Sequence, residues 1–225
     1  MRSGGLSVKL KWFGHAAFLL TAARGTRIIT DPYIPGSFDG GIGYGPIEET
    51  ADAVTVSHNH DDHAGWRLLP GNPQLIRGAG SFKVESVSIS GFDTAHDEAG
   101  GAKRGRNTVY LFELDGLRLC HLGDLGEELP KPVAGAIGAV DVLLCPVGGL
   151  FTLDAEQAHA VAASLKAKVV IPMHYKTAKL GFPIAGVVDF IRGRENVKQA
   201  SSAEVEITTA ALPAGPEIWV LNHAL

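Results

Sequence analysis

Six consecutive residues, His58-Asn-His-Asp-Asp-His63, bring three imidazoles and two carboxylates together. Such nitrogen and oxygen donors are the ligands that zinc and related divalent metals bind. A solvated polar loop is the alternative reading, but without a metal so many imidazoles would repel one another whenever they protonated. The segment therefore predicts a metal site.

The apolar segment Ala53-Val-Thr-Val-Ser57 comes directly before these residues and is expected to be a strand. Because side chains alternate along an extended chain, His58 and His60 should point the same way. A tight turn would then direct Asp62 and His63 towards a second position. The predicted site lies at the end of a buried strand, where loops commonly carry function.

The pattern His-x-His-x-Asp-His after an apolar strand resembles the signature of the metallo-β-lactamase superfamily. Further landmarks of that family follow in order, at Thr30-Asp31-Pro32, Leu122-Gly-Asp-Leu125 and Ile171-Pro-Met-His-Tyr175. The resemblance implies that one metal is bound by His58, His60 and His96, that a second is bound by Asp62, His63 and His174, and that Asp124 is shared. It also makes Asp31 a candidate to orient the metal-binding imidazoles by a hydrogen bond. Asp61 is a second candidate for that role, but it could equally cap a turn.

Two histidines compete for the third position at the first metal. By family order this ligand should precede the shared aspartate by one hairpin, which suits His96. His121 lies only three residues before Asp124, and strand pairing should turn it towards a different environment. We predict His96 as the ligand and His121 as a core histidine or a partner of a ligand.

The resemblance implies one α/β (α+β) domain over residues 1–225, folded as a four-layer αββα metallo-β-lactamase sandwich. Strand patterns fill the first half of the chain, including one strand over Lys83–Phe92. Strands and helices alternate later, with helices predicted at Asp154–Leu165 and Ile184–Arg192. Within the superfamily the chain resembles small hydrolases related to phosphorylated-ascorbate lactonase and to the N-acylphosphatidylethanolamine phospholipase D. The segments that carry this narrower resemblance are Trp12-Phe-Gly-His-Ala-Ala-Phe18, Leu144-Cys-Pro-Val-Gly-Gly149 and Val170-Ile-Pro-Met-His-Tyr175.

Two divalent metals would turn bound water into hydroxide near neutral pH and stabilise the developing oxyanion. The expected enzyme is a dinuclear hydrolase in which a metal-bridging hydroxide attacks an ester, lactone or phosphodiester. Zinc is favoured, with manganese or iron as alternatives. The candidate catalytic residues are Asp62, as a metal ligand, and His15 and Tyr175, as proton or hydrogen-bond donors. A non-catalytic metal-dependent binding protein and a nuclease are the competing interpretations.

Three further features could shape the choice of substrate. The cations of Lys103-Arg-Gly-Arg106 could bind an anionic group or lie at a solvated hairpin tip. Lys176 and Lys179 follow His174 and could reach the rim of the site. The glycine-rich segment Pro35–Pro46 is expected to be a loop, either a plain connection or a mobile flap.

The net charge of −4 and the pI near 6.1 argue against broad nucleic-acid binding. The chain lacks an apolar run of roughly 20 residues, and Met1–Lys11 lacks a secretory signal pattern. We therefore expect a cytoplasmic enzyme with a small-molecule substrate and no membrane partner, either a monomer or a homo-oligomer. Cys120 and Cys145 are expected to be buried free thiols.

Overall fold

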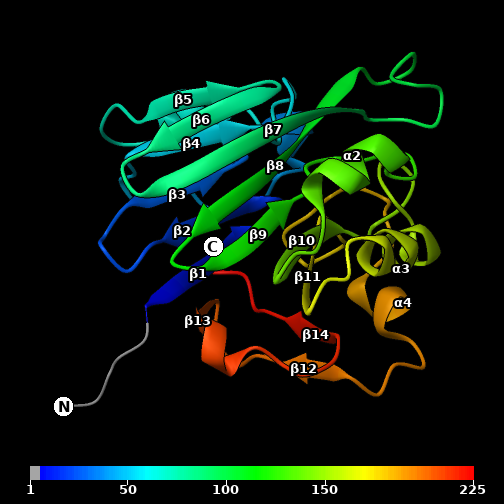
Figure 1. The fold of residues 1–225 in the computed structure, drawn as a ribbon. Coiled ribbons are helices and arrows are strands. Elements are labelled where there is room, and N and C mark those ends of the chain that lie inside the picture. Colours follow the sequence, from blue (N-terminus) through cyan, green and yellow to red (C-terminus); the bar gives the residue numbers. More distant parts are fainter. Residues whose placement is uncertain (1–5) are drawn as a thin grey trace.

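The computed structural model describes residues 6–225 (Figure 1). The first five residues of Met1–Lys11, where the sequence predicts no secretory signal, lie outside the described residues. Within 6–225 no helix is long and apolar enough to cross a membrane. The helices that exceed four residues all follow residue 130, as expected from the predicted change to alternating strands and helices: α2 (Lys131–Ile137), α3 (Ala155–Ser164) and α4 (Val187–Ile191).

The first sheet has six strands. In spatial order these are β13 (Glu204–Thr208), β1 (Ser7–Gly14), β2 (Ala17–Thr21), β3 (Arg27–Thr30), β4 (Ala53–Val56) and β5 (Gln74–Arg77). Neighbours are antiparallel from β13 to β3, whereas β3, β4 and β5 are parallel. Strands β1, β3 and β4 therefore end at the same edge of the sheet.

The second sheet has eight strands. In spatial order these are β12 (Val197–Gln199), β14 (Glu217–Val220), β11 (Val169–Met173), β10 (Val142–Pro146), β9 (Leu117–His121), β8 (Arg106–Leu114), β7 (Val87–Ala95) and β6 (Gly80–Val84). The strands from β12 to β9 run parallel, and those from β9 to β6 are antiparallel. Strands β7, β9, β10 and β11 thus point the same way.

The two sheets pack face to face, and the alternation of side chains along the first sheet separates two cores. Leu10, Trp12 and Phe18 point inward and join the large apolar cluster shared with the second sheet. Leu19 and Ile29 point outward into a smaller cluster. This period of two is the expected pattern for a strand buried on both faces.

The predicted αββα sandwich is confirmed, but its two outer layers differ. Helices α2, α3 and α4 cover the outer face of the second sheet beside β10 and β11 (Figure 1). The outer face of the first sheet is covered mainly by loop segments, from which Tyr33, Ile42 and Tyr44 pack onto it. These loops pass over the strand ends that carry the site described below.

Three features of the local structure differ from the sequence predictions. The predicted strand Lys83–Phe92 is two strands, β6 and β7, because Glu85 turns the chain in the left-handed region at φ 49°. Strands β5, β12 and β13 and helix α2 were not predicted. In the glycine-rich segment, the four-residue α1 (Ser37–Gly40) has non-helical angles at its centre, so the prediction of an irregular loop is close.

Candidate metal centre

The chemically active side chains all follow the carboxyl end of a strand at one edge of the sandwich. His15 follows β1, the segment His58–His63 follows β4, and His96 follows β7. Asp124 follows β9, and His174 follows β11. Because these strands run in the same sense in their sheets, residues up to 159 positions apart in the sequence meet in one place. We call His58, His60, Asp62, His63, His96, Asp124 and His174 the histidine cluster.

Asp124 occupies the centre of the histidine cluster. Its Oδ2 lies 3.2 Å from Nε2 of His96 and 3.2 Å from Nε2 of His174. Its Oδ1 lies 3.1 Å from Nε2 of His63, and its Oδ2 lies 3.8 Å from Nε2 of His58. One carboxylate therefore touches imidazoles from both of the predicted ligand sets.

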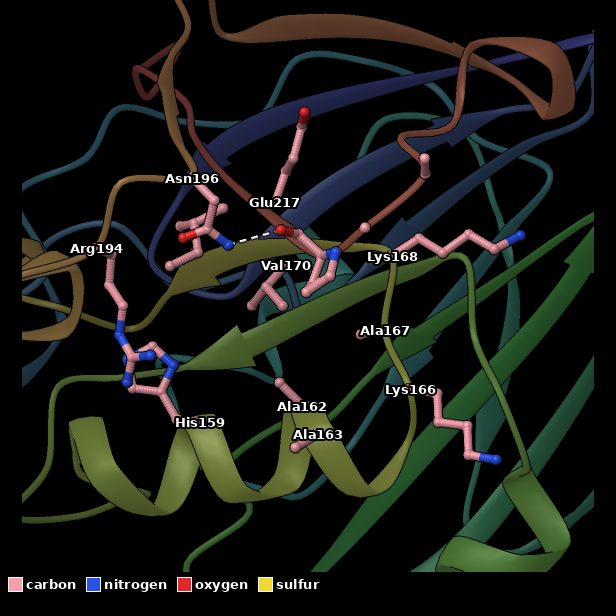
Figure 2. A pocket seen from close by; sticks show the side chains of 14 residues that line it. His159, Ala162, Ala163, Lys166, Ala167, Lys168, Val170, Arg194, Asn196 and Glu217 are labelled. Atoms are coloured by element: carbon pink, nitrogen blue, oxygen red, sulfur yellow. Dashed lines mark hydrogen bonds between the residues drawn. The ribbon is translucent and has the colours of Figure 1, made fainter.

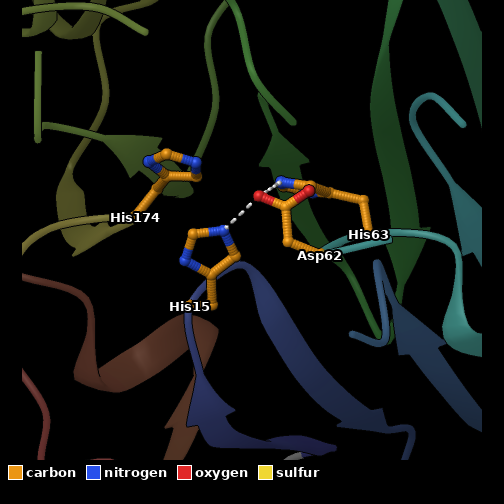
Figure 3. A group of neighbouring side chains, drawn as sticks. All are labelled: His15, Asp62, His63 and His174. Carbon is orange, nitrogen blue, oxygen red and sulfur yellow. Dashed lines mark hydrogen bonds and ion pairs between the residues drawn. The ribbon is translucent and has the colours of Figure 1, made fainter. Parts of the chain in front are cut away.

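The potential metal donors divide into groups whose atoms lie within 4.8 Å of one another. One group is His58, His60 and His96, the set expected for the first metal. A second contains Asp62, His63 and His174, the set expected for the second metal, together with His15 (Figure 3). A third, formed by Asp31, His58 and His63, joins the first two through shared imidazoles. The positions agree with the prediction, while the ligand roles remain a proposal.

Several buried polar atoms of the cluster have no hydrogen-bond partner. They include Oδ1 of Asp62, together with Oδ1 of Asp124 and Nε2 of His63, which lie 3.1 Å apart but without the geometry of a hydrogen bond. Leaving such atoms unpaired costs about 1–3 kcal/mol each or more, so native proteins rarely tolerate several together. These donors are of the types that divalent metals bind, and the residues present therefore fit a metal site.

His15 was predicted as a catalytic donor, and it lies next to Asp62. Its Nε2 is 3.1 Å from Oδ2 of Asp62, as Figure 3 shows, and its ring stands 4.1 Å from that of His174. Burial, followed by the charge of His174, lowers the pKa of His15 to about 4. His15 is therefore neutral at pH 7 and available as a hydrogen-bond donor to the carboxylate.

Asp31 is fully buried and fixes two of the imidazoles. Its Oδ2 lies 2.9 Å from Nδ1 of His63 and accepts a 2.5 Å hydrogen bond from Oγ of Ser57. The Ser57 hydroxyl lies 2.9 Å from Nδ1 of His58. This chain of contacts orients two ring nitrogens towards the cluster, which is the usual task of carboxylates behind metal-binding histidines. Asp61, the other candidate, is exposed.

Asn107 is a site residue that the sequence does not reveal. Its amide nitrogen donates to Oγ1 of Thr94 and to the carbonyl of Leu122, each at 2.9 Å. Its Oδ1 accepts from the backbone nitrogen of Asp124 at 2.9 Å. At Gly123 (φ 56°) a Cβ would come within 2.4 Å of that oxygen, so only glycine allows the contact. Asn107 lies at the start of β8, where no motif distinguishes it.

Burial and charge adjust the proton affinities inside the cluster in opposite directions. Burial, together with the charge of His63, lowers the pKa of His58 to about 3. For His63, burial acts to lower the pKa, but Asp124 and Asp62 outweigh it and raise the pKa well above its ordinary value. For Asp124, burial acts to raise the pKa, but His174 and His63 hold it well below its ordinary value. His58 is consequently neutral at pH 7, the form that binds metals.

The structure separates the two competing histidines. His96 Nε2 points to Asp124, whereas His121 Nε2 lies 2.9 Å from the carbonyl of Ala16 and its Nδ1 accepts from the backbone of Gly123. Both ring nitrogens of His121 are thus engaged in the core.

Tyr175, predicted as a catalytic donor, is placed differently. It is buried in the large core cluster, where its ring stands 5.4 Å from that of Trp12, and it does not line the cavity at the histidine cluster. Burial raises its pKa. The geometry assigns Tyr175 to packing. Cys120 and Cys145 are buried free thiols, as predicted.

A cavity of about 230 Å³ opens onto the histidine cluster. Besides cluster residues it is lined by Arg104 and by three phenyl rings, those of Phe38, Phe151 and Phe182, which we call the aromatic rim. The sequence predicted Arg104 as a candidate contact but not the aromatic rim, because these rings come from three separate loops.

Neither of the two lysines that could have reached the rim lines the cavity. Lys176 Nζ donates to the carbonyls of Leu180 and Phe182, the latter at 2.9 Å, so it anchors the loop that carries one rim phenyl. Lys179 does not line the cavity; its carbonyl accepts from the backbone nitrogen of Gly43 at 2.7 Å. The glycine-rich segment is thereby attached to the Lys179 loop.

A larger cavity, of about 430 Å³, lies between α3, β11 and β14 (Figure 2). His159 is its one histidine, and Nε2 of that residue lies 2.9 Å from the carbonyl of Phe190. Asn196 donates to the carbonyl of Pro216 at 2.6 Å. No group of metal donors among residues 6–225 lies in this cavity, so its size does not make it the functional site.

Known proteins resemble both the sequence and the fold. The beta-lactamase superfamily domain matches residues 9–174 of the chain. A UPF0173 metal-dependent hydrolase of Archaeoglobus fulgidus is 29% identical over 201 residues, which cover 77% of this chain and 85% of the relative. A crystal structure from Thermotoga maritima, assigned to the Zn-dependent hydrolases of the metallo-beta-lactamase superfamily, is 37% identical with a TM-score of 0.78, covering 95% of this chain and 98% of that one. Igni18, a metallo hydrolase of Ignicoccus hospitalis, is 27% identical with a TM-score of 0.60, covering 79% and 84%.

Proposed function

This chain belongs to the metallo-β-lactamase superfamily and is a metal-dependent hydrolase, and from that premise we propose that it uses two divalent metals to hydrolyse an ester, lactone or phosphodiester of a small molecule. Residues 1–225 act as one hydrolase domain in this proposal, because both sheets contribute to one site. A cytoplasmic location is part of the same proposal.

The observation that carries the two-metal proposal is the position of Asp124. Its two oxygens contact His63, His96 and His174, which belong to both predicted ligand sets. A carboxylate that contacts both ligand sets is suited to be a ligand of both metals. The first metal would be held by His58, His60 and His96, and the second by Asp62, His63 and His174, with Asp124 common to both. Histidine nitrogens and aspartate oxygens without a thiolate suit zinc, and also manganese or iron.

Two metals in such a site supply an activated water as the nucleophile and a positive charge that stabilises the oxyanion. The protein's own groups orient this chemistry. Asp31 fixes the ring of His63, and Ser57 fixes that of His58. His15 donates its Nε2 hydrogen to Asp62, which holds this carboxylate towards His63. His15 is therefore proposed as a positioning residue, and Tyr175 has no part in the proposal.

The metal content of the purified protein tests the two-metal proposal. The wild type should contain about two metal ions per chain, the number held by dinuclear hydrolase sites. The Asp62→Ala variant should fall towards one and lose most activity, because it lacks a ligand of one metal only. Elemental mass spectrometry on protein prepared without chelator measures both values.

The Asp61→Ala variant is the matched control. Asp61 is the exposed neighbour, and its backbone carbonyl accepts from the backbone nitrogen of Ile34 at 2.7 Å, a contact that alanine keeps. It should keep the wild-type metal content and activity. One metal or none in the wild type, after zinc, manganese and iron have been added back, would contradict the dinuclear site. So would unchanged metal content in Asp62→Ala.

A further inference from the structure

The aromatic rim is assembled from three loops and stands directly over the histidine cluster. The rings of Phe38 and Phe182 are 5.2 Å apart and edge to face, and those of Phe151 and Phe182 are 6.0 Å apart in the same arrangement. All three line the cavity together with His60, Asp62 and His174. An apolar wall therefore faces a floor of ionisable groups.

Two apolar residues, the rim residue Phe38 and Leu150 beside the rim residue Phe151, have left-handed backbone conformations. Phe38 has φ 55° and is 52% exposed, and Leu150, next to Phe151, has φ 59° and is 60% exposed. A left-handed conformation is unfavourable for a residue with a Cβ, because the Cβ comes too close to the following carbonyl oxygen. Neither side chain offsets that cost by deep burial. Strain of this kind in bulky residues collects at ligand sites.

Arg104 brings a positive charge to the same cavity. Its guanidinium lies 5.2 Å from the ring centre of Phe151, and it forms no ion pair with any carboxylate of the described residues. Its loop is fixed, because Asp97 accepts from the backbone nitrogens of Arg104 at 2.7 Å and Lys103 at 2.9 Å. A guanidinium held in place without a partner is suited to bind an anionic ligand group.

A second hollow, of about 490 Å³, meets the cavity at His60 and Arg104, which line both. Arg77 and Arg106 also line this hollow, which we call the arginine groove. Arg106 is paired with Asp93 at 2.6 Å, whereas Arg77 only contacts the Asn59 amide at 3.4 Å. Arg77 and Arg104 are thus the two cations of the groove that have no carboxylate partner within residues 6–225.

From this arrangement we propose that the hydrolase takes a two-ended substrate: an ester with one apolar ring or short chain against the aromatic rim and an anionic group bound by Arg104 and Arg77 in the arginine groove. The proposal rests on the hydrolase function given above and narrows its substrate class. The apolar end must be small, since the cavity is below the roughly 300–1,000 Å³ of ordinary ligand pockets. The scissile carbonyl would lie between the two ends, beside His60.

Phenyl hydrogen adipate combines the required groups, and methyl phenyl adipate is the same molecule with its carboxylate capped. Water attacks the acyl carbon, the bond to the phenol oxygen breaks, and phenol leaves with one proton while the acid releases the other. The release of phenol is followed optically. The wild type should show a kcat/KM about fivefold higher for the anionic ester, as expected for one ion pair near the protein surface.

Binding of 6-phenylhexanoate and of its amide, measured by calorimetry on the metal-loaded protein, gives a second readout without hydrolysis. The acid should bind more tightly than the amide. Arg104→Gln should bring the ratio of their dissociation constants towards one, and Arg77→Gln should reduce it less. Phe38→Ala should weaken both ligands without changing the ratio. Arg192→Gln is the matched control, because Arg192 follows α4 and pairs with Asp189 away from both hollows.

The outcomes separate this proposal from the proposed function. Equal rates for the two esters, with dissociation constants that Arg104→Gln leaves unchanged, would overturn the two-ended substrate and leave the hydrolase function standing. An acid preference that survives Arg104→Gln would place the anion on the metals and would also overturn it. If metal-loaded protein cleaved neither ester while the binding ratio still followed Arg104, ester hydrolysis would fail and the binding groups would stand.

Discussion

At the floor of the site, the imidazoles of His58 and His63 are held from behind by Ser57 and Asp31, and Asp124 contacts rings from both ligand sets. At the rim, by contrast, Phe38 stands on a loop, half exposed and in a left-handed conformation. The floor is built from strand ends of both sheets, whereas the rim is built only from the loops that follow or cross them.

This difference indicates two separate tasks. A metal centre needs ligands fixed within a fraction of an ångström, and buried hydrogen bonds from strand ends provide that precision. Substrate recognition needs accessible surface, which loops provide. We therefore expect substitutions of the floor ligands to remove one or both metals, and substitutions at the rim to change substrate preference while the metals remain.

The largest expected effect distinguishes two buried histidines of the floor. His96→Ala should lose metal from the first position and reduce activity more than a hundredfold, beyond the roughly 10–100-fold cost of changing a group behind a ligand. His121→Ala should keep its metal but lose about 1–3 kcal/mol of unfolding free energy, because the Ala16 carbonyl and the Gly123 amide lose their partner. Metal content and thermal unfolding of both variants check this. A greater loss of metal in His121→Ala would reverse the ligand assignment.

A smaller effect is expected behind the ligands. Asp31→Asn keeps the size of the side chain but removes the carboxylate that faces Nδ1 of His63. Metal affinity should fall by roughly 10–100-fold while the fold persists. Competition with a chelator measures the affinity. Asp52→Asn is the control, because Asp52 accepts from the backbone of Arg27 away from the cluster; equal losses in the two variants would argue against the role of Asp31.

The smallest effect should appear at the rim, and with opposite signs for stability and activity. Phe38→Gly removes the strain at φ 55° and should raise the unfolding free energy by about 1 kcal/mol. It should also lower kcat/KM for a phenyl ester a few-fold while the metal content stays constant. Leu68→Gly is the control, since Leu68 is similarly exposed but is not among the residues with positive φ, and it should not gain stability. If Phe38→Gly were less stable than the wild type, the packing of the phenyl ring would contribute more to stability than the backbone strain costs.

The sequence predicts the floor far better than the rim. Four of the floor residues lie within six positions after an apolar strand, so residue type and local spacing are sufficient. Asp31 could be named because it follows a strand in a recognisable motif. Asn107 could not, since its task depends on β8 lying beside the loop after β9, a contact that local sequence does not encode.

The rim was harder to predict for a physical reason. Lys176 was one of two lysines that could reach the rim, but its ammonium group binds the carbonyls of Leu180 and Phe182. Whether a lysine faces solvent or its own loop depends on how that loop folds. Likewise, the rings of Phe38, Phe151 and Phe182 come together from positions up to 144 residues apart, and each alone resembles an ordinary loop aromatic.

The loops that carry Phe38 and Phe182 are joined to each other by main-chain groups: Gly43 donates to the carbonyl of Lys179, and Gly181 donates to that of Gly41, each at 2.7 Å. These bonds require glycine at positions 43 and 181, where a Cβ would come within 2.7 Å of the Lys179 carbonyl oxygen and 2.9 Å of Gly41 Cα, but they do not depend on the aromatic side chains of the two loops. The pair can therefore be exchanged as a unit between related enzymes, or its aromatic residues randomised, while the metal-binding edge of the sandwich keeps its sequence. For protein engineering, the chain is thus a fixed metal-binding scaffold whose substrate-binding loops can be replaced.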